Sequence, residues 1–212
     1  MSNNQIDLGP LFSQVVKTLA NQQTQLNKAD TQNHDHGDNM VQVFNTITQA
    51  VQQKQGSPQA TQLDYAAQLL AQQNSGSAQL YAKGLQQAAQ QFKGQNIDAG
   101  NILQLIQLLM GGGQAAQPAA PASGGAGALG DLLTQLAGGQ SASSADDDKI
   151  NMQDILNAGL VYMNAKNAGA STGEALIKAL VADSAMAPTP HRAQSSELVL
   201  KTLLDVVGRM GK

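Results

Sequence analysis

The chain of 212 residues contains no cysteine and no tryptophan, and only 3% of its residues are aromatic. The lack of cysteine excludes disulfide bonds, thiolate zinc sites and a cysteine nucleophile. Charged residues make up only 13% of the chain, and the net charge is −3. Because binding to nucleic acid depends on clustered Lys and Arg, this composition argues against a nucleic-acid partner.

Long apolar runs are missing as well. No window reaches about 18 uninterrupted apolar residues, so the sequence predicts no membrane span. The first residues, Met1 to Gln5, lack the charged and apolar regions of a secretion signal. We therefore expect a cytoplasmic protein without a membrane partner, and a length that is typical of one domain.

In place of charges and aromatic side chains, the chain carries 30 Gln and 32 Ala. Ala, Gln and Leu form helices readily, and the apolar residues recur at three- and four-residue steps, as on the buried face of a helix. Such stripes occupy residues 8–19, 40–51, 63–70, 80–92, 102–109, 152–163 and 198–210. The pattern predicts an all-α fold, an antiparallel barrel or bundle of about seven or eight helices in a single domain over residues 1–212.

A long low-complexity insertion interrupts this pattern at about 111–147. The stretch from Gly111 to Ala145 holds nine Gly, two Pro and many Ala and Ser, and Asp131 is its only charged residue. Such a composition cannot bury enough apolar surface to offset the entropy that ordering costs. We therefore expect a flexible insertion, with a short helix over residues 129–136.

The polar run from Asp30 to Met40 carries the most chemistry in the sequence. It holds two of the three histidines, three carboxylates and a glycine, directly before a predicted helix. Mg²⁺ prefers carboxylates together with phosphate oxygens, and the free N–H groups of a helix start attract anions. The run therefore predicts a place for a metal-bound phosphate.

Two other interpretations of this run stay open. It can be a solvated turn in which Asp38 or Asn39 only caps the next helix. It can also be a zinc site, although His34 and His36 lack a clear third ligand and His191 is remote in the sequence.

Two later turns contain groups that suit a phosphate. In residues 74–81, Gly76 permits a close backbone approach and the hydroxyl of Ser77 can donate a hydrogen bond. In residues 191–196, Arg192 can pair with phosphate through its planar guanidinium group. The alternatives are a plain loop in which Ser77 is a helix N-cap, and an Arg192 that is only a surface charge.

A third turn, over residues 166–172, is explained fully by helix capping and requires no role in binding. Gly169 suits the end of one helix, and Ser171 and Glu174 have the spacing of a capping box at the start of the next.

In chain order, these features resemble the L subunit of dihydroxyacetone kinase, the DhaL family, which includes the nucleotide-binding domain of bacterial fatty-acid kinases. In that family an Asp-x-Asp-[His/Thr]-Gly-x-Asn-Met element binds two Mg²⁺ ions and the nucleotide phosphates. The chain reads Asn33-His34-Asp35-His36-Gly37-Asp38-Asn39-Met40 at the corresponding place, with Asn33 where the family has an Asp. The turns at 74–81, 169–174 and 192–195 are similar to later family segments in order and spacing.

The resemblance implies an eight-helix barrel whose loops at one end hold Mg²⁺ and ATP or ADP. The implied metal ligands are Asp30, Asn33 and Asp35. The implied nucleotide-binding residues are His36, Gly37, Asp38, Asn39, Gly76, Ser77 and Arg192.

The implied function is that of a Mg²⁺-nucleotide-binding subunit. It would take part in phosphoryl transfer to a small hydroxy-ketone or similar acceptor that a separate substrate-binding subunit holds. The resemblance gives no catalytic residue in this chain. The alternatives are a non-catalytic binding or scaffold protein with the DhaL fold, which the weakened acidic cluster favours, and a helical protein unrelated to kinases. Gln-rich helices with few charges are also compatible with a homo-oligomer.

Overall fold

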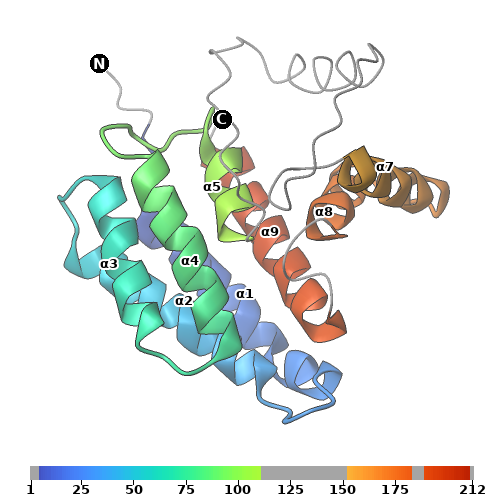
Figure 1. Ribbon diagram of the computed structural model, residues 1–212, viewed down its shortest axis with the longest axis horizontal. Coiled ribbons are helices and arrows are strands. Elements are labelled where there is room, and N and C mark those ends of the chain that lie inside the picture. Colours follow the sequence, from blue (N-terminus) through green and yellow to red (C-terminus); the bar gives the residue numbers. More distant parts are fainter. Residues whose placement is uncertain (1–4, 111–151, 183–188, 211–212) are drawn as a thin grey trace.

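The computed structural model describes residues 5–110, 152–182 and 189–210 (Figure 1). Within these ranges the chain forms eight helices and no strand, and one isolated bridge joins Gln5 to Asp98. The helices are α1 (Leu8–Ala29), α2 (His36–Gln53), α3 (Gln59–Ala71), α4 (Gly76–Gln91), α5 (Ile102–Leu109), α7 (Met152–Asn167), α8 (Thr172–Ala182) and α9 (Pro190–Met210). The predicted all-α class is confirmed for this part of the chain. The expected insertion at about 111–147 and the short helix at 129–136 lie outside the described residues.

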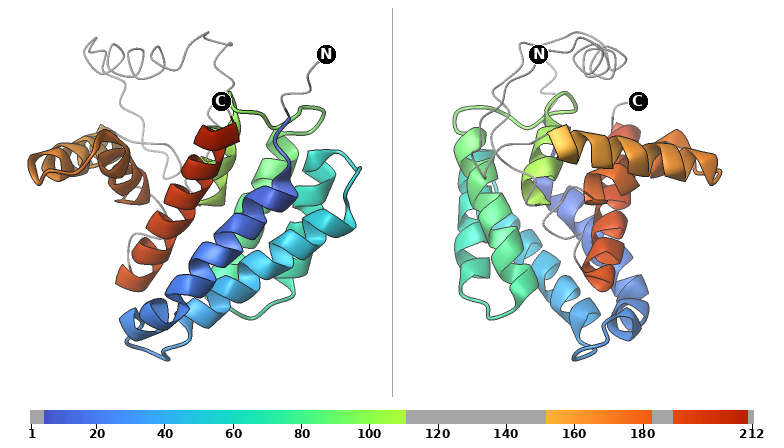
Figure 2. Two further views of the ribbon diagram at one scale, coloured as in Figure 1. Left: turned by 180° about the vertical axis from the view of Figure 1, so that it is seen from behind. Right: turned by 45° about the vertical axis from the view of Figure 1, so that its right-hand side comes forward.

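The helices α1 to α4 and α9 form the main body. Helix α1 packs along both α2 and α9, α2 packs along α3, and α3 packs along α4. Helix α5 lies against α4 and touches α9, while α7 packs on α8, which in turn packs on α9. Figure 2 shows α7 and α8 to the side of this body, beyond α9. The short connections between the first four helices make their neighbours run antiparallel.

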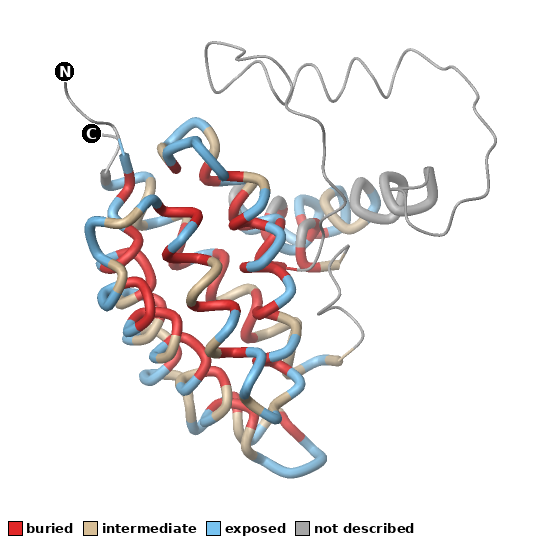
Figure 3. Tube along the Cα trace, turned by 60° about the vertical axis from the view of Figure 1, so that its left-hand side comes forward, coloured by how far each residue is buried: buried red, intermediate tan, exposed pale blue. Residues whose placement is uncertain are grey.

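The apolar stripes of α1 to α5 and of α9 face the interior, as the buried positions in Figure 3 show. The stripe expected over residues 152–163 does not, because Leu160 and Met163 on α7 are 67% and 63% exposed. Aromatic side chains from three helices meet in the interior. The ring of Phe44 lies 6.3 Å from that of Phe12 and 5.0 Å from that of Tyr81, measured between centroids. These contacts join α1, α2 and α4, so that α2 and α4 are held at fixed positions relative to α1.

Two glycines allow helices to approach closely. A Cβ on Gly84 would collide with the carbonyl oxygen of Leu108, where α4 meets the end of α5. A Cβ on Gly37 would collide with the carbonyl oxygen of Gln23 and would lie 2.7 Å from Oδ1 of Asn27. The start of α2 is therefore pressed against the last turns of α1, and this contact positions the loop between them.

The turn between α7 and α8 has the structure that its sequence predicts. Gly169 has φ of 86°, a conformation that favours glycine after a helix end. The N–H of Ser171 donates to Oε2 of Glu174 at 3.0 Å, and the N–H of Glu174 donates to Oγ of Ser171 at 3.2 Å. The capping box is confirmed, and this segment does not line the cavity described below.

Candidate functional site

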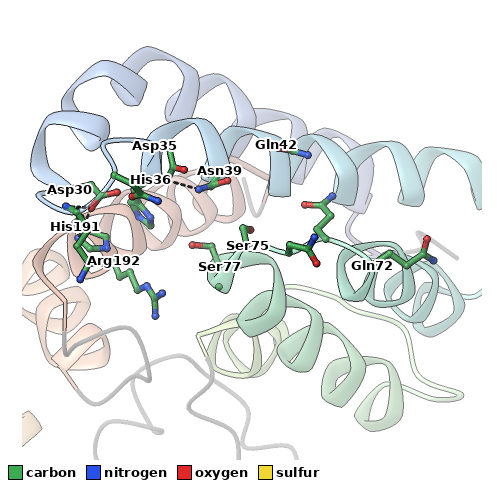
Figure 4. Close-up of a pocket in the computed structure, with 15 residues that line it drawn as sticks. Asp30, Asp35, His36, Asn39, Gln42, Gln72, Ser75, Ser77, His191 and Arg192 are labelled. Carbon is green, nitrogen blue, oxygen red and sulfur yellow. Dashed lines mark hydrogen bonds and ion pairs between the residues drawn. The ribbon is translucent and has the colours of Figure 1, made fainter.

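Three segments that are far apart in the sequence line one open cavity of about 610 Å³ (Figure 4). They are the α1–α2 loop with the first turns of α2, the α3–α4 turn with the start of α4, and the start of α9. The lining residues are Asp30, Gln32, Asn33, Asp35, His36, Asn39, Gln42, Gln72, Gln73, Asn74, Ser75, Gly76, Ser77, His191 and Arg192. Every one of them is polar or a glycine.

The start of α4 forms one wall of this cavity. The hydroxyl of Ser75 accepts a hydrogen bond from the N–H of Ala78 at 3.1 Å, so Ser75 is the N-cap. The alternative that made Ser77 the N-cap is wrong. Ser77 is only 5% exposed and lines the cavity, and neither its hydroxyl nor the N–H groups of Gly76 and Ser77 have a hydrogen-bond partner in the described part of the chain.

Arg192 extends from the start of α9 toward this helix start (Figure 4). Its Nη2 atom lies 2.8 Å from the position that a Cβ on Gly76 would occupy. Its Nε atom is buried and has no hydrogen-bond partner among the described residues. The guanidinium charge and the positive end of the α4 dipole therefore act on the same volume, which favours an anion there.

His36 connects α2 to α9. The hydroxyl of Ser195 donates to the carbonyl oxygen of Arg192 at 3.0 Å, so it accepts from Nε2–H of His36, 2.9 Å away. This chain of hydrogen bonds gives the neutral imidazole its proton on Nε2. Burial, followed by the nearby charges of His191 and Arg192, lowers the pKa of His36 to about 4, although Asp30 opposes this shift. His36 is therefore neutral near pH 7, and it positions the backbone of Arg192.

Asp30 anchors the loop that follows α1. Its Oδ1 atom accepts the N–H of Gln32 at 3.0 Å and lies 3.9 Å from Nδ1 of His191. The hydrogen bond from Gln32 holds the pKa of this carboxyl below its ordinary value, with help from His191 and against the effect of burial. Asp30 is 2% exposed. It therefore keeps a negative charge in the wall of the cavity.

Asp35 is the second carboxylate of the cavity. It is half-buried, and Nδ2 of Asn39 donates to its Oδ1 atom at 2.7 Å. Within the described ranges, no three His, Cys, Asp or Glu side chains are grouped so that they could hold a metal ion. The carboxylates of Asp30 and Asp35 and the amide of Asn33 line the same cavity, and two carboxylates are too few to balance the charge of two Mg²⁺ ions.

Gly37 and Asp38 lie outside the cavity lining. Oδ1 of Asn27 accepts the N–H groups of Gly37 at 2.6 Å and Asp38 at 3.2 Å. The side chain of Asp38 accepts from Asn27 and Gln23, which lowers its pKa. The first N–H groups of α2 are thus capped by α1, and the alternative in which Asp38 or Asn39 caps this helix is wrong. The expectation that these N–H groups are free for a phosphate is wrong for the same reason.

Of the ten residues expected in a site, eight line the cavity. They are Asp30, Asn33, Asp35, His36, Asn39, Gly76, Ser77 and Arg192. The structure adds His191, whose ring centroid lies 4.7 Å from that of His36, and an amide wall of Gln42, Gln72, Gln73 and Asn74. Gln42 is three residues after Asn39 on the same face of α2, which is a signal that the sequence contained.

The chain was compared with models of known protein families, with curated proteins and with solved structures, and it matches none of them significantly. In the part of the chain that the structure describes, no helix combines the length and the apolar character that crossing a membrane requires.

Proposed function

We propose that the cavity binds a Mg²⁺-chelated nucleotide, ATP or ADP, and that the chain is a DhaL-like subunit that takes part in phosphoryl transfer. The acceptor is a small hydroxy-ketone or similar compound held by a separate subunit. The observation that carries the proposal is the position of Arg192, whose Nη2 atom lies 2.8 Å from the Cβ position of Gly76. The guanidinium group of Arg192 and the positive end of the α4 dipole come from distant parts of the sequence. They meet in a cavity that also contains carboxylates.

The phosphates belong at the start of α4. The N–H groups of Gly76 and Ser77, the hydroxyl of Ser77 and the guanidinium group of Arg192 all donate toward this point. Donors that are fixed before the ligand arrives stabilise charge on phosphate oxygens without further reorganisation. In phosphoryl transfer, such positioning and charge neutralisation are most of what a protein contributes.

The carboxylates of Asp30 and Asp35 and the amide of Asn33 are the residues that would hold Mg²⁺. The ion would neutralise charge on the phosphate oxygens that it binds. His36 remains neutral and keeps the start of α9 in place through Ser195, so that Arg192 stays opposite α4.

The proposal also covers the architecture of the whole chain. Residues 1–212 form a single DhaL-like domain, its helices form a barrel, and the loops at one end of the barrel hold the nucleotide. A cytoplasmic location and a homo-oligomer are compatible with this function.

The second candidate is a non-catalytic binding or scaffold protein with the same fold. It is favoured by the internal hydrogen bonds of the two carboxylates, because Asp30 accepts from the backbone of Gln32 and Asp35 accepts from Asn39. Asn33 adds no charge that would help to hold a second cation. Such a protein would serve as a binding or scaffold module and would transfer no phosphoryl group.

The melting temperature with and without Mg²⁺-ADP and Mg²⁺-ATP tests whether the chain binds a nucleotide. A ligand that binds the native state raises the free energy of unfolding by about 2.7 kcal/mol at a hundredfold excess over Kd. We expect a Mg²⁺-dependent rise that is lost in Arg192→Ala and reduced in Asp35→Asn. Arg209→Ala is the matched control, because this exposed arginine on α9 only pairs with Asp205.

No rise at millimolar nucleotide would contradict the nucleotide-binding proposal and favour the non-catalytic candidate. A rise that survives in Arg192→Ala would contradict the proposed site. Transfer of the γ-phosphoryl group, followed by ³¹P NMR once the acceptor-binding subunit is identified, separates the catalytic from the non-catalytic candidate.

A further inference from the structure

The polar lining of the cavity limits which ligands it can recognise. We infer, on the basis of the proposed function, that the cavity recognises a phosphorylated polyhydroxy compound through its phosphate and hydroxyl groups and does not distinguish nucleobases. The ribose phosphate part of a nucleotide belongs to this class, as do sugar and polyol phosphates.

The first argument is the chemistry of the walls. Ligand pockets are usually lined mainly by apolar and aromatic side chains, with a few polar groups that fix the orientation. In the described chain, every side chain that lines this cavity is polar, and the remaining residue is Gly76. A nucleobase is held largely by stacking on an aromatic or apolar surface. The only planar side chains with a ring or a guanidinium group that line the described cavity are His36, His191 and Arg192, and Arg192 lies against the start of α4.

The second argument is the division of the cavity into two parts. The charged part contains Arg192, His191 and the two carboxylates, and the start of α4 adjoins it. Figure 4 shows Gln42 and Gln72 on the far side of Ser75 from this charged part. The ligand that fits both parts has an anionic end and a neutral end that forms hydrogen bonds.

The amide wall at the neutral end suits hydroxyl groups. A carboxamide has two donors and an acceptor, and a hydroxyl both donates and accepts. The side chains of Gln42 and Gln72 have no hydrogen-bond partner in the described ranges, so their amides are available. Nε2 of Gln73 donates a hydrogen bond to Oγ1 of Thr46 at 2.8 Å, so the side chain of Gln73 has a fixed position in this wall.

The third argument is that polar groups of the cavity without a partner point to the phosphate. Nε of Arg192 is buried and has no hydrogen-bond partner among the described residues. The side chain of Ser77 is 5% exposed and lines the cavity between its charged and neutral parts. Its hydroxyl has no partner among the described residues. The phosphate therefore sits at the charged end beside Ser77, and the hydroxyl-bearing carbon chain extends toward Gln42 and Gln72.

Calorimetric titration tests the inference on the full chain. The probes are Mg²⁺-ATP, Mg²⁺-GTP, Mg²⁺-UTP, ribose 5-phosphate and pyrophosphate. We expect the three nucleotides to bind with dissociation constants that agree within about threefold, because the base adds little. Dissociation constants of the three nucleotides that agree within this range support the inference. An affinity for ATP more than about tenfold above that for GTP and UTP would overturn it, while it would leave the proposed function standing.

A double variant tests the amide wall. The double variant Gln42→Ala with Gln72→Ala removes two amides. It should weaken the binding of ribose 5-phosphate and of the nucleotides about tenfold. The binding of pyrophosphate should stay unchanged, since pyrophosphate has no hydroxyl-bearing chain. The control is Gln49→Ala with Gln86→Ala, which removes two exposed amides from α2 and α4 outside the cavity.

Equal affinities in the double variant and the control would overturn the role of the amide wall. If neither pyrophosphate nor any nucleotide binds, the proposed function fails and the inference fails with it. A preference for ATP is a different result, so the two failures are distinguishable.

Discussion

The guanidinium group of Arg192 occupies the space that a side chain at position 76 would need. Nη2 of Arg192 lies 2.8 Å from the Cβ position of Gly76, although the two residues belong to the last helix and to the start of α4. A distance below 3 Å is too short for a real Cβ, so either the arginine or the backbone has to move when position 76 has a side chain. Gly76 thus allows the guanidinium group from α9 to lie at the start of α4.

Replacing Gly76 with alanine should therefore weaken ligand binding without unfolding the protein. The methyl group displaces the flexible end of Arg192 from the helix start, and we expect the affinity for Mg²⁺-ADP to fall about tenfold, which corresponds to about 1.4 kcal/mol. Alanine is favoured over glycine in a helix by roughly 0.5–1 kcal/mol, so the melting temperature without ligand should not fall. Calorimetric titration and a thermal melt check the two parts. An unchanged affinity would show that Arg192 does not act at this position.

Gly84 is expected to give the opposite result when it is replaced with alanine. The new methyl group would collide with the backbone of Leu108, which cannot turn away as an arginine side chain can. Overpacking of this kind costs about 1–3 kcal/mol, so urea unfolding should show a lower free energy of unfolding. Gly208→Ala is the matched control, because nothing lies within 4 Å of its Cβ position. If both variants unfold at the same urea concentration, α4 and α5 do not meet as described.

The helices could be predicted from the sequence because their signal is local. Met40, Phe44, Ile47 and Val51 recur at the period of a helix, and all four are buried on α2. The capping box at Ser171 could be predicted for the same reason, since its two partners are three residues apart.

The candidate site could be predicted only in part, because its partners are distant in the sequence. Nothing local indicates that Asn27 of α1 caps α2, so the helix start that seemed open to phosphate is closed. In the α3–α4 turn two hydroxyls compete for one role, and the extended backbone of Ser75 decides that it is the cap. Gln72 could not be recognised as a lining residue among 30 glutamines, whereas Gln42 shares a helix face with Asn39.

Asn27 should contribute to stability more than a half-buried polar residue usually does. Its side-chain oxygen Oδ1 accepts hydrogen bonds from the backbone N–H groups of Gly37 and Asp38, and its Nδ2 atom donates to Oδ1 of Asp38 at 2.9 Å. We expect Asn27→Ala to lower the free energy of unfolding by about 1–2 kcal/mol, as the loss of a helix cap does. Urea unfolding measures this change.

A double-mutant cycle with Asp38→Ala isolates the contact between the two side chains. The two losses should not add, since the variants remove the same hydrogen bond. Strict additivity would show that Asn27 acts only through the backbone of α2.

The stability of the protein should fall on acidification because of His36. Burial, with the charges of His191 and Arg192, lowers the pKa of His36 to about 4 in the folded protein. The unfolded chain has an ordinary histidine pKa near 6.5, so it takes up the proton first as the pH falls. The free energy of unfolding is therefore unaffected by His36 above about pH 6.5 and decreases between about pH 6.5 and pH 4, by roughly 3 kcal/mol in total.

Urea unfolding at several pH values within this window checks the effect. The pKa of the Asp30 carboxyl is lowered by the N–H of Gln32, so Asp30 reduces stability only at a lower pH, below about 4. We expect His36→Asn to flatten the dependence on pH. His34→Asn is the control, because His34 is exposed and its φ of 57° suits asparagine. The free energy of unfolding of His36→Asn could instead depend on pH as steeply as that of the wild-type protein, while that of His34→Asn does not. The buried neutral imidazole of His36 would then not be the group that titrates.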